Sequence, residues 1–64
     1  MTKQDYELIA STVWDARRVA KQAGKYTPEA KAVIDDLVGV MVAEFKRRNP
    51  NFRADLFVKA CELS

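Results

Sequence analysis

The sequence contains no histidine, a single cysteine and only two glycines among its 64 residues. One cysteine, Cys61, excludes an internal disulfide, and without histidine or a cluster of thiolates no zinc site of familiar spacing can be built. The lack of histidine also removes the usual general base near neutral pH. We therefore expect no metal, no cofactor and no enzymatic activity, and we expect Cys61 to pack as a small buried hydrophobe.

Long apolar runs are also absent, as is a positively charged start followed by an apolar segment. We therefore expect neither a membrane helix nor an export signal, and the lone thiol fits a cytoplasmic protein. Residues 1–64 are enough for one domain, which buries only about 60% of the surface of its unfolded chain. Domains of this size usually need a disulfide, a metal or oligomerisation, and here only oligomerisation remains.

A first helix is predicted over residues 3–23. Thr2 is followed three positions later by Asp5, which is the spacing of a capping box, and Gly24 is a natural residue to end a helix. Apolar residues recur three and four positions apart along this segment. The side chains expected on its core face are Tyr6, Ile9, Ala10, Val13, Ala16 and Ala20.

A second helix is predicted over residues 28–48. Thr27 supplies a cap hydroxyl, Pro28 occupies the first helical position, and Asn49-Pro50 stops the helix. The short connection makes the first two helices an antiparallel hairpin. On the exposed face we expect Lys31 to pair with Asp35 one turn later. The side chains expected on the core face are Ala30, Val33, Ile34, Leu37, Val38, Met41 and Phe45.

A third, short helix is predicted over residues 52–62, with Asn51 as its N-cap. A helix of about eleven residues is marginal by itself in water, so it must dock Phe52 and Phe57 on the hairpin to be stable. The predicted fold class is therefore all-α: a three-helix domain made of an antiparallel helical hairpin and a short docked C-terminal helix.

The end of the chain carries the pattern Asn49-Pro50-x-Phe52-x-x-x-x-Phe57-x-x-Ala60-Cys61. It resembles the C-terminal signature of short helical proteins encoded by bacteriophages and prophages, and the start, Met1-Thr2-Lys3-Gln4-Asp5-Tyr6, is similar to theirs as well. The chain departs from the family pattern at Arg53, where an aspartate cap is usual, and at Glu62, where glycine usually closes the helix. The resemblance implies a phage or prophage origin, hence the cytoplasm of a bacterial host, and no defined activity.

The uncharged run from Leu37 to Ala43 points to self-association. Apolar residues on most sides of a helix indicate burial by several neighbours. Gly39 costs about 1 kcal/mol relative to alanine inside a helix, so another backbone is expected near it, either the first helix or a second copy of the chain. A homodimer through the second helix follows as a prediction, with an interface made by Leu37, Gly39, Val40, Val42 and Ala43.

A partner-binding surface is predicted on the first helix, where Leu8 and Val19 form a second apolar stripe. Trp14 lies on the other flank of the core face, and it either packs against the third helix or serves as an exposed anchor. The predicted binding residues are therefore Leu8, Trp14 and Val19. The expected function is that of a small phage accessory protein that binds and modulates or inhibits a host or defence protein, without catalysis.

Weak nucleic-acid binding is the alternative function. The net charge of +2 is small, and the basic cluster from Arg17 to Lys25 lies at the opposite end of the hairpin from the second cluster. One continuous phosphate track is therefore not expected, and the third helix lacks the polar exposed face of a recognition helix. The residues that would carry this function are Lys46, Arg47, Arg48 and Arg53.

Overall fold

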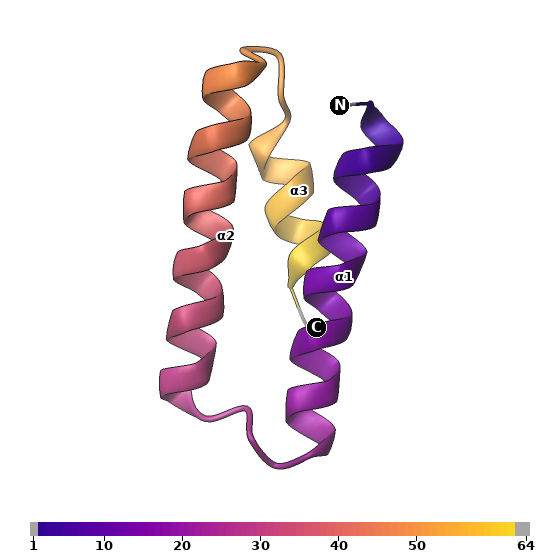
Figure 1. Cartoon of the computed structure of the whole chain (residues 1–64). Coiled ribbons are helices and arrows are strands. Elements are labelled where there is room, and N and C mark those ends of the chain that lie inside the picture. The colour runs from indigo at the N-terminus through magenta and orange to yellow at the C-terminus, as the bar shows by residue number, and fades with distance from the viewer. Residues whose placement is uncertain (1, 63–64) are drawn as a thin grey trace.

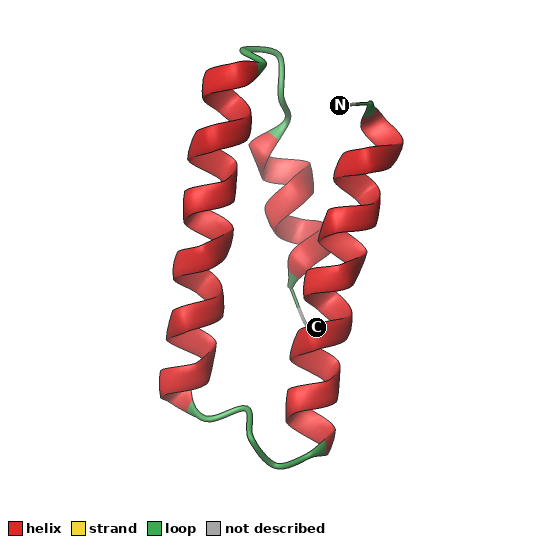
Figure 2. Cartoon of the chain, viewed as in Figure 1, coloured by secondary structure: helices red, strands yellow, loops and turns green. Residues whose placement is uncertain are grey.

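Three α-helices make up the fold (Figure 1). In a computed structural model, which describes residues 2–62, α1 spans Lys3–Gln22, α2 spans Pro28–Arg48 and α3 spans Ala54–Cys61. Figure 2 shows the helices joined by two loops, and none of the described residues forms a strand. The predicted all-α, three-helix fold is confirmed. No helix in the described part of the chain is both long enough and apolar enough to cross a membrane.

The first two helices begin at the predicted caps. The Thr2 hydroxyl accepts from the backbone N–H of Asp5 at 3.4 Å, and the Asp5 carboxylate accepts from the backbone N–H of Thr2 at 2.8 Å, which completes a capping box. At the start of α2 the Thr27 hydroxyl accepts from the N–H of Ala30 at 3.1 Å. Gly24 follows α1 with a φ of 71°, a left-handed conformation that favours glycine.

The third helix begins two residues later than residue 52, where the sequence predicted its start. Its N-cap position falls on Arg53, whose side chain makes no capping hydrogen bond. The predicted cap, Asn51, lies instead in the preceding turn, where its N–H donates to the side-chain oxygen of Asn49 at 3.2 Å. The N–H of Phe52 donates to the backbone carbonyl of Asn49 at 2.9 Å, and these two bonds hold residues 51 and 52 in the turn.

The hairpin of α1 and α2 is covered on one side by α3. Figure 1 shows α1 and α2 side by side with α3 behind them, and α3 packs on both helices, mainly on α1. An α-helix rises about 1.5 Å per residue, so α3 is about 12 Å long and α2 about 30 Å. α3 therefore covers only the end of the hairpin formed by the start of α1 and the end of α2.

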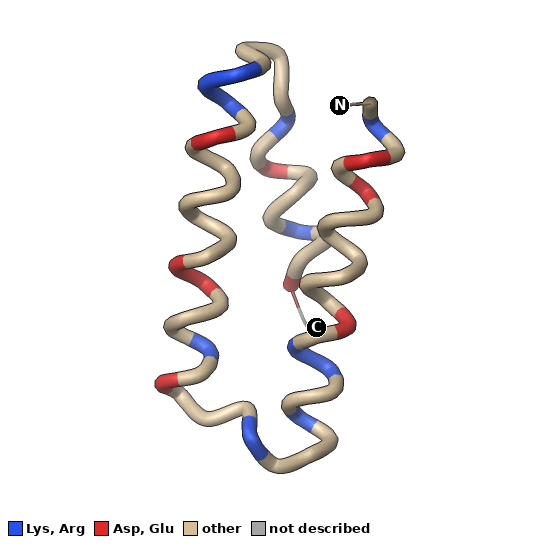
Figure 3. The backbone as a smooth tube through the Cα atoms, in the orientation of Figure 1, with Lys and Arg blue, Asp and Glu red and all other residues tan. Residues whose placement is uncertain are grey.

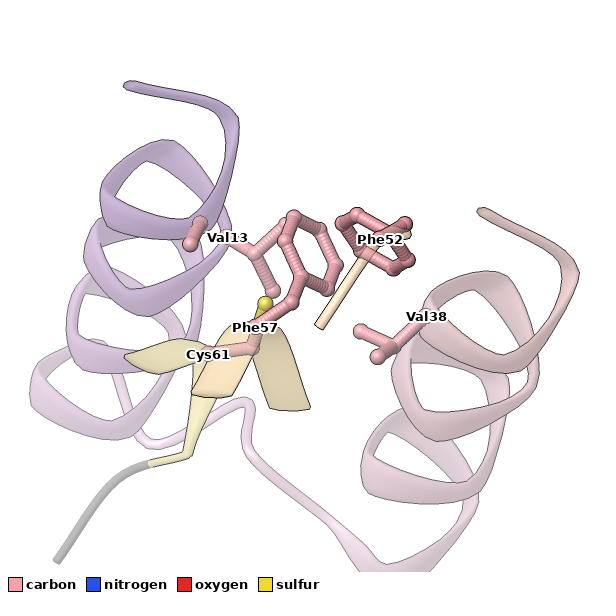
Figure 4. Packing of buried hydrophobic residues seen from close by; sticks show 6 residues of the cluster. Val13, Val38, Phe52, Phe57 and Cys61 are labelled. Atoms are coloured by element: carbon pink, nitrogen blue, oxygen red, sulfur yellow. The ribbon is translucent and has the colours of Figure 1, made fainter. Parts of the chain in front are cut away.

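The core lies where the three helices meet. Phe52 is buried, and its ring centroid lies 4.7 Å from that of Tyr6, 5.4 Å from that of Phe45 and 5.6 Å from that of Phe57. Tilted and edge-on arrangements at these distances are favourable. The predicted docking of Phe52 and Phe57 on the hairpin is confirmed. The buried apolar side chains, shown in Figure 4, are Ala10, Val13, Val38, Phe52, Phe57 and Cys61.

Some side chains predicted for the core are exposed instead. On α2, Val33 is 68% exposed and Leu37 is 54% exposed, and on α1 Ala16 is also exposed. Val33 and Leu37 belong to the predicted apolar face, as does Val38. Only the part of this face that contains Val38 is buried. The apolar face of α2 is therefore wider than the part that the rest of the chain covers.

Candidate functional site

Exposed aliphatic side chains are the main feature of the surface. Among residues 2–62, six large apolar side chains are more than half exposed, as many as the six that form the buried core. Single exposed apolar residues are ordinary, but contiguous patches mark interaction sites. The exposed residues are Leu8, Val19, Val33, Leu37, Val40 and Leu56.

The residues predicted for the dimer interface do not lie on one face of α2. With about 100° of rotation per residue, Leu37 and Val40 are neighbours, whereas Gly39 is about 160° and Val42 about 140° away from Leu37. Val42 is partly buried against the core, while Gly39 and Ala43 are exposed. A flat partner that covers Leu37 and Val40 does not reach the other three residues.

Gly39 is not a point of close approach within the chain. A Cβ atom placed on Gly39 meets nothing within 4 Å among the described residues. Packing of α1 against this glycine, one of the two explanations that its position suggested, is therefore wrong.

The three residues predicted to bind a partner are also divided between two faces of α1. Leu8 and Val19 are 66% and 56% exposed on the outer side of the helix. Trp14 lies about 120° around the helix from Leu8 and is half-buried. The guanidinium carbon of Arg18 lies 5.5 Å from the centre of the Trp14 ring, a cation–π contact. Trp14 is thus neither a core residue nor part of the surface around Leu8.

A buried arginine links α1 and α2 beside the end of α3. Arg17 is 3% exposed, its Nη2 lies 2.9 Å from Oδ1 of Asp35, and its Nη1 donates to the Tyr26 hydroxyl at 2.8 Å. Asp35 also accepts from Nζ of Lys31 at 2.9 Å, which confirms the predicted pair. The hydrogen bonds from Lys31 and then from Arg17 lower the pKa of Asp35. Together they hold the loop and the start of α2 against α1.

A groove of about 460 Å³ lies beside this cluster, lined by Arg17, Lys31, Asp35 and Glu62 among others. Two positive and two negative side chains balance one another, so the groove does not select an anion by charge. The Nε atom of Arg17 has no hydrogen-bond partner among the described residues. The cluster is therefore interpreted as a structural link between α1 and α2.

Sequence reasoning missed the burial of Arg17 because it grouped this residue with the basic cluster at the end of α1. One signal was present. Arg17 follows Val13 by four positions and Ala10 by seven, and both of those side chains are buried. An arginine that continues a buried stripe at helical spacing needs a carboxylate partner, and Asp35 supplies it.

The basic side chains that were predicted to bind nucleic acid form ion pairs or hydrogen bonds with neighbouring groups. Glu44 accepts from two of the arginines, Asp55 pairs with a third at 3.1 Å, and the lysine donates to the Phe52 carbonyl at 3.2 Å. Figure 3 shows this cluster and the basic residues in the second half of α1 at opposite ends of the hairpin. The arrangement does not form one continuous positive track. The residues concerned are Lys46, Arg47, Arg48 and Arg53.

Cys61 is completely buried, and its predicted packing as a small hydrophobe is confirmed. Loss of solvent raises the pKa of its thiol, which disfavours the reactive thiolate. Among residues 2–62, no three histidine, cysteine, aspartate or glutamate side chains come together in a way that could hold a metal ion.

Comparison with protein-family models, curated proteins and solved structures finds no match to this chain. The fold and the surface define a small all-α domain with exposed aliphatic side chains on α1 and an exposed aliphatic patch on α2. Its function is therefore argued from the chemistry of those patches.

Proposed function

We propose that this protein is a small phage or prophage accessory factor that acts in the bacterial cytoplasm by binding a host or defence protein, without catalysis. The exposed aliphatic surface of α1 carries the proposal. Leu8 and Val19 hold no position in the core, yet both project large apolar side chains into solvent from the same side of the helix. Burial of such a surface by a partner is favourable, because it removes apolar area from water.

The polar residues beside Leu8 favour burial of this surface. The hydroxyls of Ser11 and Thr12 donate to the backbone carbonyl of Leu8, at 2.9 and 2.8 Å. Because these donors already have a partner within the helix, covering them with an apolar surface costs less than covering unpaired hydroxyls. The outer surface of α1 is defined here as Leu8, Thr12, Asp15 and Val19, with the Asp15 carboxylate paired to Arg18. The internal bonds of its hydroxyls lower the cost of covering it with a protein partner.

The charges beside this surface are mixed. Asp15 lies on the same line of the helix, between Leu8 and Val19, and pairs with Arg18 at 3.7 Å. Charge therefore does not favour an acidic partner over a basic one here. Trp14 lies about 120° around the helix from Leu8, outside this surface.

The test uses the full chain as bait in a lysate of a bacterial host, followed by titration of the purified partner. Leu8→Ser combined with Val19→Ser is compared with Leu56→Ser, a control at an equally exposed leucine on α3. We expect the native chain and the control to bind one protein, and the double variant to bind it at least about ten-fold more weakly with its helicity unchanged.

Equal binding by the double variant would show that the outer surface of α1 is not the site. If the native chain captures no protein from the lysate, the proposed function is contradicted.

A further inference from the structure

A second apolar patch lies on α2, centred on Leu37. Residues three and four positions apart are neighbours on a helix surface, and all four such neighbours of Leu37 are aliphatic or thioether side chains. They are Val33, Ile34, Val40 and Met41. Leu37 is 54% exposed, and Val33 and Val40 are 68% and 66% exposed. A half-exposed leucine surrounded in this way is the centre of a contiguous apolar surface, called here the Leu37 patch.

The Leu37 patch faces away from α3. The residues of α2 that line the groove next to the end of α3 include Val38, Gly39 and Val42. They lie about 100–160° around the helix from Leu37. The patch therefore faces away from this groove and from the end of α3. Ile34 and Met41 extend from this patch into the core and are only partly buried.

We propose that a second copy of the chain covers the Leu37 patch, with the two hairpins packed face to face and their α2 helices antiparallel. This inference extends the proposed protein-binding role to a partner that can be named, and it uses a different surface from the outer surface of α1. An isologous contact of this kind places the same patch on both sides of the interface.

The charges of α2 favour the antiparallel arrangement. Glu29 and Arg47 are 18 positions apart, which is about five helical turns, so they lie on the same edge of the helix, next to Val40. Leu37 and Val40 lie near the midpoint between them. A two-fold axis through this midpoint brings Glu29 of each copy beside Arg47 of the other, where it adds a second carboxylate to the ion pair that Arg47 makes with Glu44 of its own helix. The same axis opposes the two helix dipoles. A parallel arrangement would align the like-charged ends of the two helices.

The first experiment measures mass by sedimentation and light scattering from micromolar to millimolar concentration. Leu37→Glu is compared with Leu56→Glu, which places the same charge at a leucine of nearly equal exposure on α3. We expect the native chain and Leu56→Glu to dimerise, and Leu37→Glu to weaken the dimer by roughly a hundred-fold or more, because both copies lose the burial of this leucine. Circular dichroism checks that each variant keeps its helices.

A charge exchange tests the orientation independently. Glu29→Arg and Arg47→Glu are each expected to weaken the dimer several-fold, and the double variant is expected to recover most of the native affinity. A native chain that stays monomeric, or a dimer that survives Leu37→Glu, would overturn the inference. Failure of the double variant to recover affinity would overturn the antiparallel arrangement. None of these outcomes depends on capture of a foreign protein through Leu8 and Val19, so the two proposals fail separately.

Discussion

Arg17 and Asp35 show how a charged pair can take the place of apolar packing. α3 ends beside Arg17, and the guanidinium of Arg17 links α1 to Asp35 in the first half of α2. The pair is asymmetric, since Arg17 is buried while the side chain of Asp35 is 45% exposed. Asp35 therefore stays in contact with water, and its carboxylate neutralises a guanidinium that would otherwise be buried without a counter-charge.

The lowered pKa of Asp35 predicts a loss of stability in acid. Hydrogen bonds from Lys31 and from Arg17 favour the carboxylate in the folded chain. The stabilisation is therefore fully present above the unfolded pKa of about 3.9 and is lost as the pH falls through the lower, folded pKa. Asp35→Asn should reduce the free energy of unfolding at neutral pH and should flatten its decline in acid, as measured by urea denaturation across this pH range.

Asp36→Asn is the matched control, because Asp36 is the exposed neighbour of Asp35 and lies outside the cluster. Its stability curve should run parallel to that of the native chain. If Asp35→Asn also gives a parallel curve, the carboxylate of Asp35 does not contribute to stability in the way described.

Among the helices, α3 depends most on its docking. It has only eight residues, and the side chain at its N-cap position makes no capping hydrogen bond. Helices this short are unstable alone, so its structure comes from burial of Phe57 and Cys61 against the hairpin. In contrast, α1 and α2 each begin with a side-chain cap and are long enough to leave surface for partners.

Gly39 lowers the stability of α2, and its replacement by alanine tests this. Glycine in a helix interior is less stable than alanine, and a Cβ atom at this position meets nothing within 4 Å. Gly39→Ala should therefore raise the free energy of unfolding by about 0.5–1 kcal/mol, as measured by urea denaturation. The proposed dimer should be unaffected, because Gly39 lies away from the Leu37 patch.

Ala43→Gly is the converse control, since Ala43 is also exposed on α2 and should lose a similar amount of stability. A loss of stability or of dimer affinity on Gly39→Ala would mean that another chain approaches this glycine after all.

At the scale of the whole molecule, stability is concentrated at one end. The aromatic cluster joins all three helices where α3 docks, while the other end of the hairpin depends on the Arg17 cluster and the loop. Six buried apolar side chains form a small core for a chain of this length. A domain of this size has a total stability of roughly 3–10 kcal/mol, so the loss of one large core residue affects the entire fold.

Phe52→Ala tests this view of the whole molecule. Its ring contacts Tyr6, Phe45 and Phe57, so its removal should cost about 3–5 kcal/mol. The midpoint of thermal unfolding, followed by circular dichroism, should fall by more than about 10 °C. Leu56→Ala removes an exposed side chain from α3 and should change the midpoint little. Similar midpoints for the two variants would contradict the central role of the aromatic cluster.

The helices themselves are determined by the sequence alone. Thr2 with Asp5, and Thr27 before Pro28, predict the starts of α1 and α2 because a cap is made by residues three or four positions apart. The docking of Phe52 and Phe57 could be predicted too, because a short C-terminal segment with two large aromatic residues must bury them. These features depend on residues that are close together in the sequence, so their spacing is enough to predict them. The start of α3 at Ala54, after Phe52, could not be predicted in this way.

Only the tertiary structure decided which sector of each helix is covered. Val33 and Leu37 belong to the same apolar face as Val38, and their exposure follows from the length of α3 and from the side on which it docks. Arg17 is buried because the end of α3, Asp35 of α2 and Tyr26 of the loop come together around it. Contacts between segments that are distant in the sequence decide which side chains are buried. Helical periodicity shows which residues share a face of one helix, but it does not show which other helix covers that face.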